Sequence, residues 1–383
     1  MFKTSPGTAR NVYTGFAGVL PLDRKRTGPA NRALRLVLVM QDEDGKGLDV
    51  RRRVAVFGGD GFLGSHFVER LLEQGHTVTV FDRFRSGTAK NLAQLQGRVR
   101  LIAGDFADQA AVAAALEGQE VAAHFVGATL PVCSWEDPLR PIDVDLRQAV
   151  NFFGLCAGQG VRKIIFPASG GTLYGRQSGL QDESSLPAPF NPYGIAKLAA
   201  QNFLAYYREK CGIASDSFRI GNVYGPRQPL DRPQGVVAAW IGRILNGQPL
   251  ELYGDQETVR DYVHAADAAL LMTHSLRDLD ATDTYNLGSG SGTSILELLS
   301  IFRRVSDRPF VCRVQPRRSS DNTSAILTSA KLLRHFPDFH HRPLEEGIRE
   351  TFRWAMASRQ ERSCLAGSLS SLPGTPGRWP NPI

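Results

Sequence analysis

A tyrosine and a lysine four residues apart are the first residues in this sequence that could do chemistry. Tyr193 and Lys197 lie in the segment NPYGIAK, and Asn191 and Pro192 are typical of a helix start. A spacing of four residues places both side chains on one face of a helix. A free phenol has a pKa near about 10, so a tyrosine base working near neutrality needs a neighbouring positive charge. The pair indicates acid/base chemistry, although two unrelated residues on a helix surface would have the same spacing.

A glycine turn follows the first strand that the sequence predicts. The segment GGDGFLG places Gly58, Gly61 and Gly64 between an apolar run at residues 52–58 and a helical apolar pattern. Glycines permit a tight turn and a close approach of the backbone to a diphosphate, which the first N–H groups of the helix attract. The turn therefore predicts a dinucleotide site, although a turn that serves only helix packing would look the same.

An acidic residue, Asp82, ends the second predicted strand, 21 residues after Gly61. Its carboxylate would accept hydrogen bonds from the adenosine ribose and repel a 2'-phosphate, which favours NAD over NADP. Arg83 and Arg85 weaken this preference, because arginine can neutralise a 2'-phosphate. After the third strand, Asp105 is placed either to bond the adenine amino group or to serve as an ordinary acid at a strand end.

Six short apolar runs are separated by helical stretches in the body of the chain. The runs cover residues 52–58, 76–82, 98–104, 120–127, 162–169 and 215–221. Their spacing is too long for hairpins and suits β-helix-β crossovers, and both alternating faces of each run are apolar. This predicts an α/β fold with a doubly wound parallel sheet, whose ligands bind at the carboxyl ends of the strands. His124, inside the fourth run, is interpreted as a core residue rather than a catalyst.

The charge of the chain is concentrated at its amino end. The net charge is +7, but residues 1–40 hold seven Lys or Arg and one acid, so no basic face for nucleic acid is expected on the folded body. No apolar stretch reaches the roughly 18 residues of a membrane span. Five widely spaced cysteines predict neither a disulfide framework nor a metal site, and favour a reducing, cytoplasmic compartment.

The composition divides the chain into a head, a body and a tail. Residues 1–50 predict a disordered extension, translation from an upstream start, or an organelle transit peptide. Residues 357–383 predict a flexible tail. Within the body, a dinucleotide-binding domain is expected over 51–222, with 261–289 returning to it, and a second domain over 223–260 and 290–356.

Taken in order, these motifs resemble the extended short-chain dehydrogenase/reductase family, in its nucleotide-sugar epimerase/dehydratase branch. The resemblance runs from Arg53 to Trp354 and is closest to UDP-glucose 4-epimerase-like members. It implies a Rossmann domain for NAD and a smaller, partly interleaved C-terminal substrate-binding domain. Besides the segments above, it rests on SGGTLYG (169–175), RIGNVYGPRQ (219–228), LYGDQETVRDYVHAADAA (252–269), YNLGSG (285–290) and RSSD (318–321).

The resemblance also implies a role for individual residues. Tyr193 would be the acid/base on the sugar hydroxyl, and Lys197 would bind the nicotinamide ribose. Residues matching positions that bind the nucleotide diphosphate of the substrate are Asn222, Arg260, Arg318 and Asp321. Residues expected at the cofactor, together with Tyr193 and Lys197, are Gly58, Gly61, Phe62, Leu63, Gly64, Asp82, Arg83, Asp105, Phe106, Phe125 and Gly127.

The sequence departs from the family pattern at several positions. The hydroxyl four residues before the tyrosine of the YG motif is replaced by Gly170, so Thr172, Ser169 or a water must take its place. The same segment lacks the Asp-Glu pair of a sugar 4,6-dehydratase and the Glu of a decarboxylating relative, which disfavours elimination. Thr129 stands where 4-epimerases often have lysine, and Asp145 where the family usually has asparagine.

The resemblance implies an epimerase that inverts C4 of a UDP-sugar through a transient 4-keto sugar, with NAD regenerated in each turnover. A nucleotide-sugar reductase or dehydrogenase of the same family, and a noncatalytic dinucleotide-binding protein, are the alternatives. The resemblance further implies a homodimer joined by helices near residues 140–158 and 192–210. Phe152, Leu155 and Leu204 fit such an interface, and core packing explains them equally well.

Overall fold

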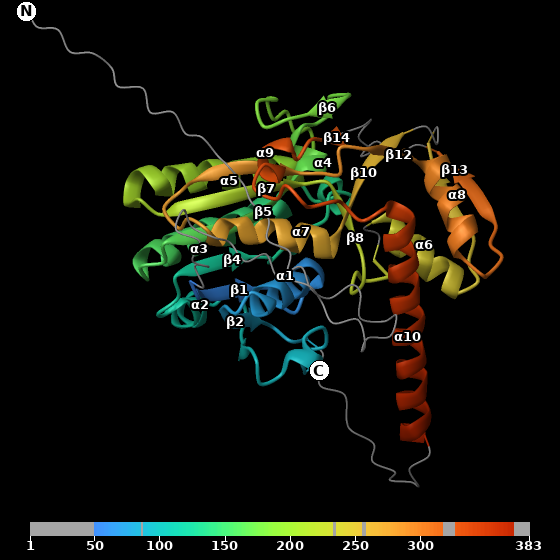
Figure 1. Ribbon diagram of the computed structural model, residues 1–383, viewed down its shortest axis with the longest axis horizontal. Helices are drawn as coiled ribbons and strands as arrows, with labels where there is room; N and C mark the ends of the chain where they lie inside the picture. Colours follow the sequence, from blue (N-terminus) through green and yellow to red (C-terminus); the bar gives the residue numbers. More distant parts are fainter. Residues whose placement is uncertain (1–49, 86, 233–234, 255–257, 317–325, 371–383) are drawn as a thin grey trace, which may run out of the picture. The chain divides into compact units, whose positions relative to one another are not determined.

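A seven-stranded parallel sheet is the centre of the fold (Figure 1). The computed structural model describes residues 50–85, 87–232, 235–254, 258–316 and 326–370, with the helix backbone alone for 361–370. The strand order β11-β7-β5-β4-β1-β2-β3 confirms the doubly wound sheet predicted from the apolar runs. The strands are β1 (Arg53–Phe57), β2 (Thr77–Asp82), β3 (Arg100–Ala103), β4 (Val121–His124), β5 (Lys163–Ser169), β7 (Ala214–Ile220) and β11 (Asp283–Leu287).

Helices cover both faces of this sheet, which explains why its strands are apolar on both sides. One face carries α1 (Phe62–Glu73) and α7 (Ala265–Met272), which pack against each other. The other carries α2 (Gln109–Leu116), α3 (Arg147–Gly158) and α5 (Pro192–Cys211). The direction of winding reverses between β1 and β4, and such a reversal opens a crevice at the carboxyl ends of these strands.

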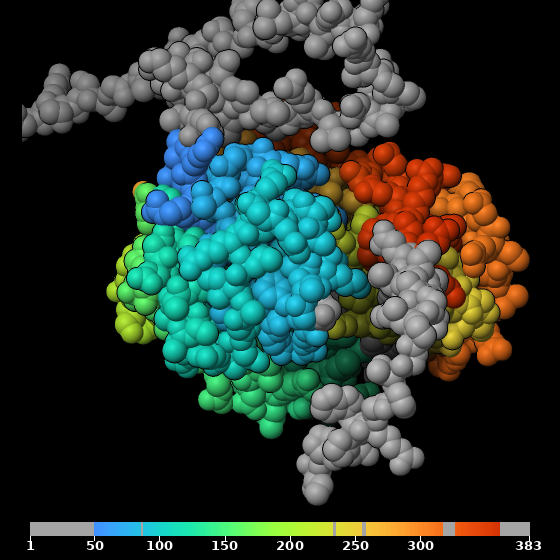
Figure 2. All heavy atoms as spheres, turned by 90° about the horizontal axis from the view of Figure 1, so that it is seen from below, coloured from blue at the N-terminus to red at the C-terminus, as the bar shows by residue number. Residues whose placement is uncertain are grey.

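A second layer of smaller elements lies beside the carboxyl edge of the large sheet. On the face shown in Figure 2, the blue and cyan residues of the first strands and helices lie next to the yellow, orange and red residues of this layer. Its helices share one apolar core. The layer contains the sheets β12-β10-β8 and β13-β9 and the helices α6 (Val236–Leu245), α8 (Ile295–Val305) and α10 (Leu344–Ser370). Its strands are β8 (Asn222–Tyr224), β9 (Leu250–Tyr253), β10 (Val259–His264), β12 (Gly292–Ser294) and β13 (Cys312–Gln315).

Short elements complete the described part of the chain. A two-stranded sheet joins β6 (Leu180–Gln181) to β14 (Ile326–Leu327), and α4 (Gly170–Leu173) and α9 (Ala330–Leu333) are single turns. The helical turns η2 (Ala93–Leu95), η3 (Cys133–Trp135), η4 (Pro141–Leu146) and η5 (Thr273–Leu276) lie in the connections. None of the described helices combines the length and the apolar character that crossing a membrane requires. The division of the body into two domains stays a prediction.

The last helix is longer than the sequence predicts. The tail was expected to begin at residue 357, but α10 continues to Ser370. Residues 355–362 are almost all good helix formers, and Arg359 ties the helix to α6 by donating to the backbone oxygen of Leu245 and to Asn246 Oδ1. The helix therefore extends past residue 357, where the tail was expected to begin, and the flexibility of the tail stays a prediction.

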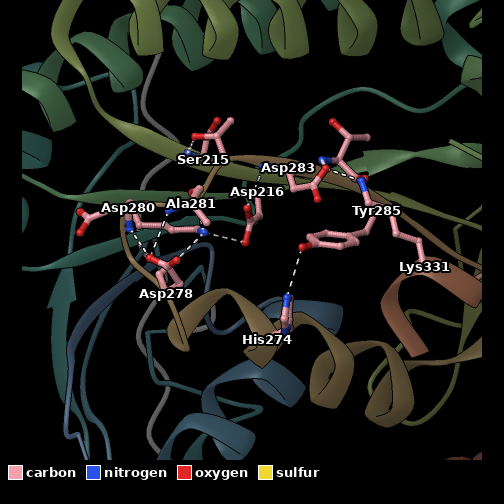
Figure 3. Close-up of polar contacts among 12 residues, drawn as sticks. Ser215, Asp216, His274, Asp278, Asp280, Ala281, Asp283, Tyr285 and Lys331 are labelled. Carbon is pink, nitrogen blue, oxygen red and sulfur yellow. Dashed lines mark hydrogen bonds and ion pairs between the residues drawn. The ribbon is translucent and has the colours of Figure 1, made fainter. Parts of the chain in front are cut away.

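A buried ion pair closes the amino edge of the sheet, opposite the crevice. Lys163 begins β5, and its Nζ lies 2.8 Å from Oδ2 of Asp216 on β7. The same ammonium donates to the backbone oxygens of Asp278 and Ala281, both at 3.0 Å. Figure 3 shows this group of contacts, with His274 pointing at the hydroxyl of Tyr285. The three hydrogen bonds satisfy the buried cation and tie the last crossover to the sheet.

Candidate active site

The helix α5 begins where the sequence predicts and carries Tyr193 and Lys197 in its first two turns. The side chain of Asn191 caps it by accepting a 2.7 Å hydrogen bond from the N–H of Gly194, and Pro192 occupies its first position. Both functional side chains are half-buried. Lys197 Nζ lies 5.8 Å from the centre of the Tyr193 ring and 5.0 Å from that of Phe166 on β5.

Burial favours the neutral form of both side chains, the phenol of Tyr193 and the amine of Lys197. Desolvation raises the pKa of Tyr193, and the carboxylate of Asp145 raises it further. Desolvation lowers the pKa of Lys197, whereas Asp145 opposes this change. In the protein alone Tyr193 is therefore a neutral phenol, and a base at this position requires additional positive charge.

A cleft of about 790 Å³ lies between α5 and the second layer, and Tyr193 is on its wall. It also brings together four other residues that the sequence predicts for the site, Ser169, Thr172, Asn222 and Arg260. Arg318 and Asp321, also predicted for substrate binding, lie outside the described residues. Sequence analysis missed several other segments of the wall, namely residues 130–132, 235–237, 239–240 and 242–243. Most of these present apolar side chains or backbone, so no motif distinguishes them from core.

The single turn α4, which directly follows β5, explains why a glycine occupies the position of the expected hydroxyl. A Cβ atom at Gly170 would lie 2.2 Å from Cδ1 of Leu327 and 3.0 Å from the backbone oxygen of Arg219. The hydroxyl of Thr172 donates to the backbone oxygen of Ser169 at 3.4 Å, and Thr172 is almost fully buried. Ser169 is half-buried on the cleft wall, and its side chain does not cap α4. Of the two side chains, Ser169 is therefore better placed to face a substrate.

The glycine turn has the geometry of a diphosphate cradle. Gly58 has φ +77°, and a Cβ atom there would lie 2.8 Å from the backbone carbon of Phe125. A Cβ atom at Gly64 would lie 2.4 Å from the backbone oxygen of Gly58. Only glycine at position 64 therefore allows α1 to pack this closely against the turn. The helix begins after Gly61 without a side-chain cap or an acid in its first turn, which leaves its first N–H groups for a ligand.

The carboxylate of Asp82 closes this turn at the end of β2. Its Oδ2 accepts a hydrogen bond of 3.1 Å from the N–H of Asp60, and its Oδ1 accepts a longer one of 3.4 Å from the N–H of Phe84. Asp82 is only half-buried, so its carboxylate also borders open space. An acid fixed at the second strand end beside a glycine turn matches the binding of an adenosine ribose.

The other predicted cofactor residues lie along the same edge of the sheet. Phe62 and Leu63 begin α1, and Phe125 and Gly127 follow β4. Arg83, Asp105 and Phe106 follow β2 and β3. The guanidinium of Arg83 lies 3.9 Å from Asp105 with both side chains about half exposed, so neither holds the other tightly. The residues present thus fit a dinucleotide laid across the carboxyl ends of β1, β2 and β4.

The comparisons with known proteins agree with this geometry. A sequence model described as the NAD dependent epimerase/dehydratase family matches residues 54–288. The chain belongs to this family. A UDP-glucose 4-epimerase from Lacticaseibacillus casei is 30% identical over 303 residues, covering 73% of this chain and 88% of the relative. One from Mycolicibacterium smegmatis is 29% identical over 283 residues, covering 73% and 90%.

Solved structures of the family have the same fold. UDP-glucose 4-epimerase from Thermus thermophilus in complex with NAD is 32% identical, with a TM-score of 0.72 over 79% of this chain and 98% of the other. A dTDP-glucose 4,6-dehydratase from Streptomyces venezuelae with NAD bound is 26% identical, with a TM-score of 0.74 over 81% and 98%. Membership of an NAD-dependent family confirms the cofactor that the glycine turn and Asp82 predict.

Proposed function

We propose that the protein is an NAD-dependent epimerase that inverts C4 of a UDP-sugar. The observation that carries the proposal is the shared cleft, which Tyr193, Ser169, Asn222 and Arg260 line together. Relatives named as UDP-glucose 4-epimerases, which the chain matches over about three quarters of its length, support this choice of reaction. The short GGT segment at 170–172 has no carboxylate for an elimination, which argues against a dehydratase.

The residues of the chain have separate parts in this reaction. Tyr193 accepts the proton of the C4 hydroxyl and returns it after the sugar has turned over. Lys197 stabilises the phenolate by its charge and holds the cofactor ribose, and Ser169 donates a hydrogen bond to the sugar oxygen. The glycine turn and Asp82 would hold NAD, which would supply reversible hydride chemistry at C4 and a positive charge near the phenol.

Asn222 and Arg260 bind the nucleotide diphosphate of the substrate in this proposal. The side-chain amide of Asn222 donates to the backbone oxygen of Asp261 at 3.2 Å, which orients it at the start of β8. The guanidinium of Arg260 bonds the backbone oxygen of Val259 at 3.0 Å, which positions its charge on β10 beside the cleft. An amide and a guanidinium are suited to the oxygens of a diphosphate, so these residues anchor the substrate while its sugar rotates.

The test is conversion of UDP-glucose to UDP-galactose by the purified full chain, followed by NMR of C4 without added cofactor. Interconversion is the expected result. In Tyr193→Phe the rate of conversion should fall by about a thousandfold or more, because this variant lacks the acid/base. A requirement for stoichiometric added NAD(H) would indicate a reductase or dehydrogenase. Binding of UDP-sugar without conversion would indicate a noncatalytic protein. Either of these two outcomes rejects the epimerase.

We further propose that α5 and η4 join two copies of the chain. Exposed apolar side chains lie along the outer face of α5, including Ile195, Phe203 and Tyr206, and Ile142 is exposed on η4. Phe203 follows Ile195 by about eight positions and Tyr206 follows Phe203 by about three, and both spacings keep residues on one face of a helix. The three α5 residues therefore form an apolar stripe. Of the three residues suggested from the sequence, Phe152 and Leu204 belong to the core and Leu155 is half-buried against it.

A further inference from the structure

An acidic side chain, Asp145, lies between the Tyr193–Lys197 pair and the segment that follows β4. It sits on η4, a turn of π-helix that precedes α3, a form of helix that is rare and common at functional sites. Its Oδ1 accepts a 2.9 Å hydrogen bond from the N–H of Ala128, and its Oδ2 accepts a bond from the hydroxyl of Thr129. The carboxylate thus fixes the chain immediately after the predicted cofactor residue Gly127.

The same carboxylate and the catalytic pair line one small cavity. The cavity measures about 10 Å³ and is lined by Asp145, Tyr193, Lys197 and His124 together with apolar side chains. The remaining lining residues, Leu146, Ala149, Phe166, Ala196 and Ala200, carry no charge. Among the described residues that line the cavity, Asp145 is the only acid. Lys197 is the only cation in that set, because burial and the charge of Lys197 lower the pKa of His124 to about 3 and leave this imidazole neutral.

We propose that Asp145 is a positioning residue that holds Lys197 as an ammonium ion and fixes the Ala128–Thr129 segment against the catalytic pair. The inference rests on the proposed function, because it assigns Asp145 to the acid/base pair of that reaction. Three effects follow from this one side chain, two from its charge and one from its hydrogen bonds. Lys197 stays protonated although it is half-buried, the phenol of Tyr193 is harder to ionise, and the chain beside the cofactor cannot shift without losing the two bonds to Asp145.

The effect on Lys197 and Tyr193 depends on the negative charge of Asp145 and not on the shape of its side chain. An asparagine at position 145 can accept from the N–H of Ala128 with its amide oxygen and pair its NH₂ group with the hydroxyl of Thr129. Asp145→Asn therefore keeps both bonds and removes only the charge. Asp143 on the same turn provides the matched control, because it is exposed and pairs with Arg147 at 2.9 Å on the surface.

The first measurement does not require turnover. Competitive acetylation of the full chain over a range of pH, read by peptide mass spectrometry, gives the titration of each lysine, with exposed Lys210 as an internal reference. In D145N, Lys197 should lose its proton about 1 pH unit lower than in the wild type, since a neighbouring opposite charge has been removed. In D143N it should titrate as in the wild type. Equal titration of Lys197 in all three proteins overturns the proposal.

The second measurement uses the reaction. In D145N the acid limb of kcat/KM against pH should move to lower pH, because the phenol of Tyr193 no longer ionises beside a carboxylate. An unmoved acid limb in an active D145N enzyme also overturns the proposal. A chain that shows the lysine shift but converts no UDP-sugar rejects the proposed function alone. If D145N does not fold, Asp145→Ser removes the same charge and keeps a hydroxyl for Thr129, and its lysine titration decides.

Discussion

The Nζ of Lys163 lies 2.8 Å from the Oδ2 of Asp216, and both side chains are almost completely buried. Lys163 is the first residue of β5, and Asp216 is the third residue of the neighbouring strand β7, so Lys163 lies about 20 Å along its strand from the carboxyl end. Desolvation raises the pKa of Asp216, and the charge of Lys163 opposes this rise. The pair therefore affects folding without touching the site.

Lys163→Met should destabilise the protein by about 3 to 5 kcal/mol, because Asp216 then remains buried without a counter-charge. The check is urea unfolding followed by circular dichroism. Arg162→Met is the control: Arg162 pairs with Asp280 at 2.9 Å, but the side chains are 46% and 77% exposed. That change should cost no more than about 1 kcal/mol. If both variants lose the same free energy of unfolding, the buried pair contributes no more to stability than the exposed pair.

The loss in Lys163→Met should also depend on pH. Without Lys163 the pKa of Asp216 rises further in the folded state, so the folded protein holds a proton that the unfolded chain has released. Folding then becomes more favourable as the pH falls, and the gap to the wild type should be smaller at about pH 5 than at about pH 8. A gap that widens on acidification would contradict this assignment.

A methyl group at Gly170 should disturb the turn that carries Ser169. Gly170→Ala places a Cβ atom 2.2 Å from Leu327 and should cost about 1 to 3 kcal/mol in the free energy of unfolding. Gly171→Ala is the matched control, because a Cβ atom there meets nothing within 4 Å. If the contact with Leu327 is the cause, adding Leu327→Ala should cost less in the G170A background than in the wild type.

The carboxylate of Asp82 should set the choice between NAD and NADP. Asp82→Asn keeps an oxygen for the N–H of Asp60 but removes the charge, so NAD should bind about tenfold more weakly and NADP should be rejected less strongly. Isothermal titration with both dinucleotides measures the ratio. Asp105→Asn, at an exposed and loosely paired acid, should leave that ratio unchanged. An unchanged ratio in D82N would show that the dinucleotide lies elsewhere.

The apolar stripe on α5 should hold two copies of the chain together. Phe203→Asp places a charge in this stripe and should convert a dimer to a monomer in sedimentation experiments at micromolar protein, because the charge would be buried twice at a two-fold interface. Leu296→Asp on α8 introduces the same charge at another exposed apolar residue and should leave the oligomeric state unchanged. A monomeric wild type would remove the interface altogether.

Local patterns were sufficient to predict most of the fold. The apolar runs gave the strands because a strand buried on both faces has few other compositions, and Asn191 with Pro192 gave the start of α5 within a residue. The glycine turn was equally visible, since its spacing reflects contacts within a few residues. These features depend on neighbours in the sequence.

Contacts between distant segments could not be predicted in this way. The reason for Gly170 is Leu327, which lies on a strand of two residues too short to leave a pattern. The bond from Thr129 to Asp145 joins the segment after β4 to η4, so the sequence identified both residues as departures without showing that they meet. The continuation of α10 past residue 357 was missed because Arg359 ties the helix to the end of α6, a tertiary contact that the sequence does not reveal.

The acceptors for Lys163 on residues 278 and 281 have a consequence for how the protein is made. On the ribosome, β5 and β7 emerge long before these carbonyl groups and before β11, which completes the sheet. We expect that the amino-terminal half cannot mature by itself during synthesis. A message truncated after β7 would yield a product in which Lys163 keeps Asp216 but lacks both carbonyl acceptors, and we expect cellular proteases to degrade this incompletely bonded sheet.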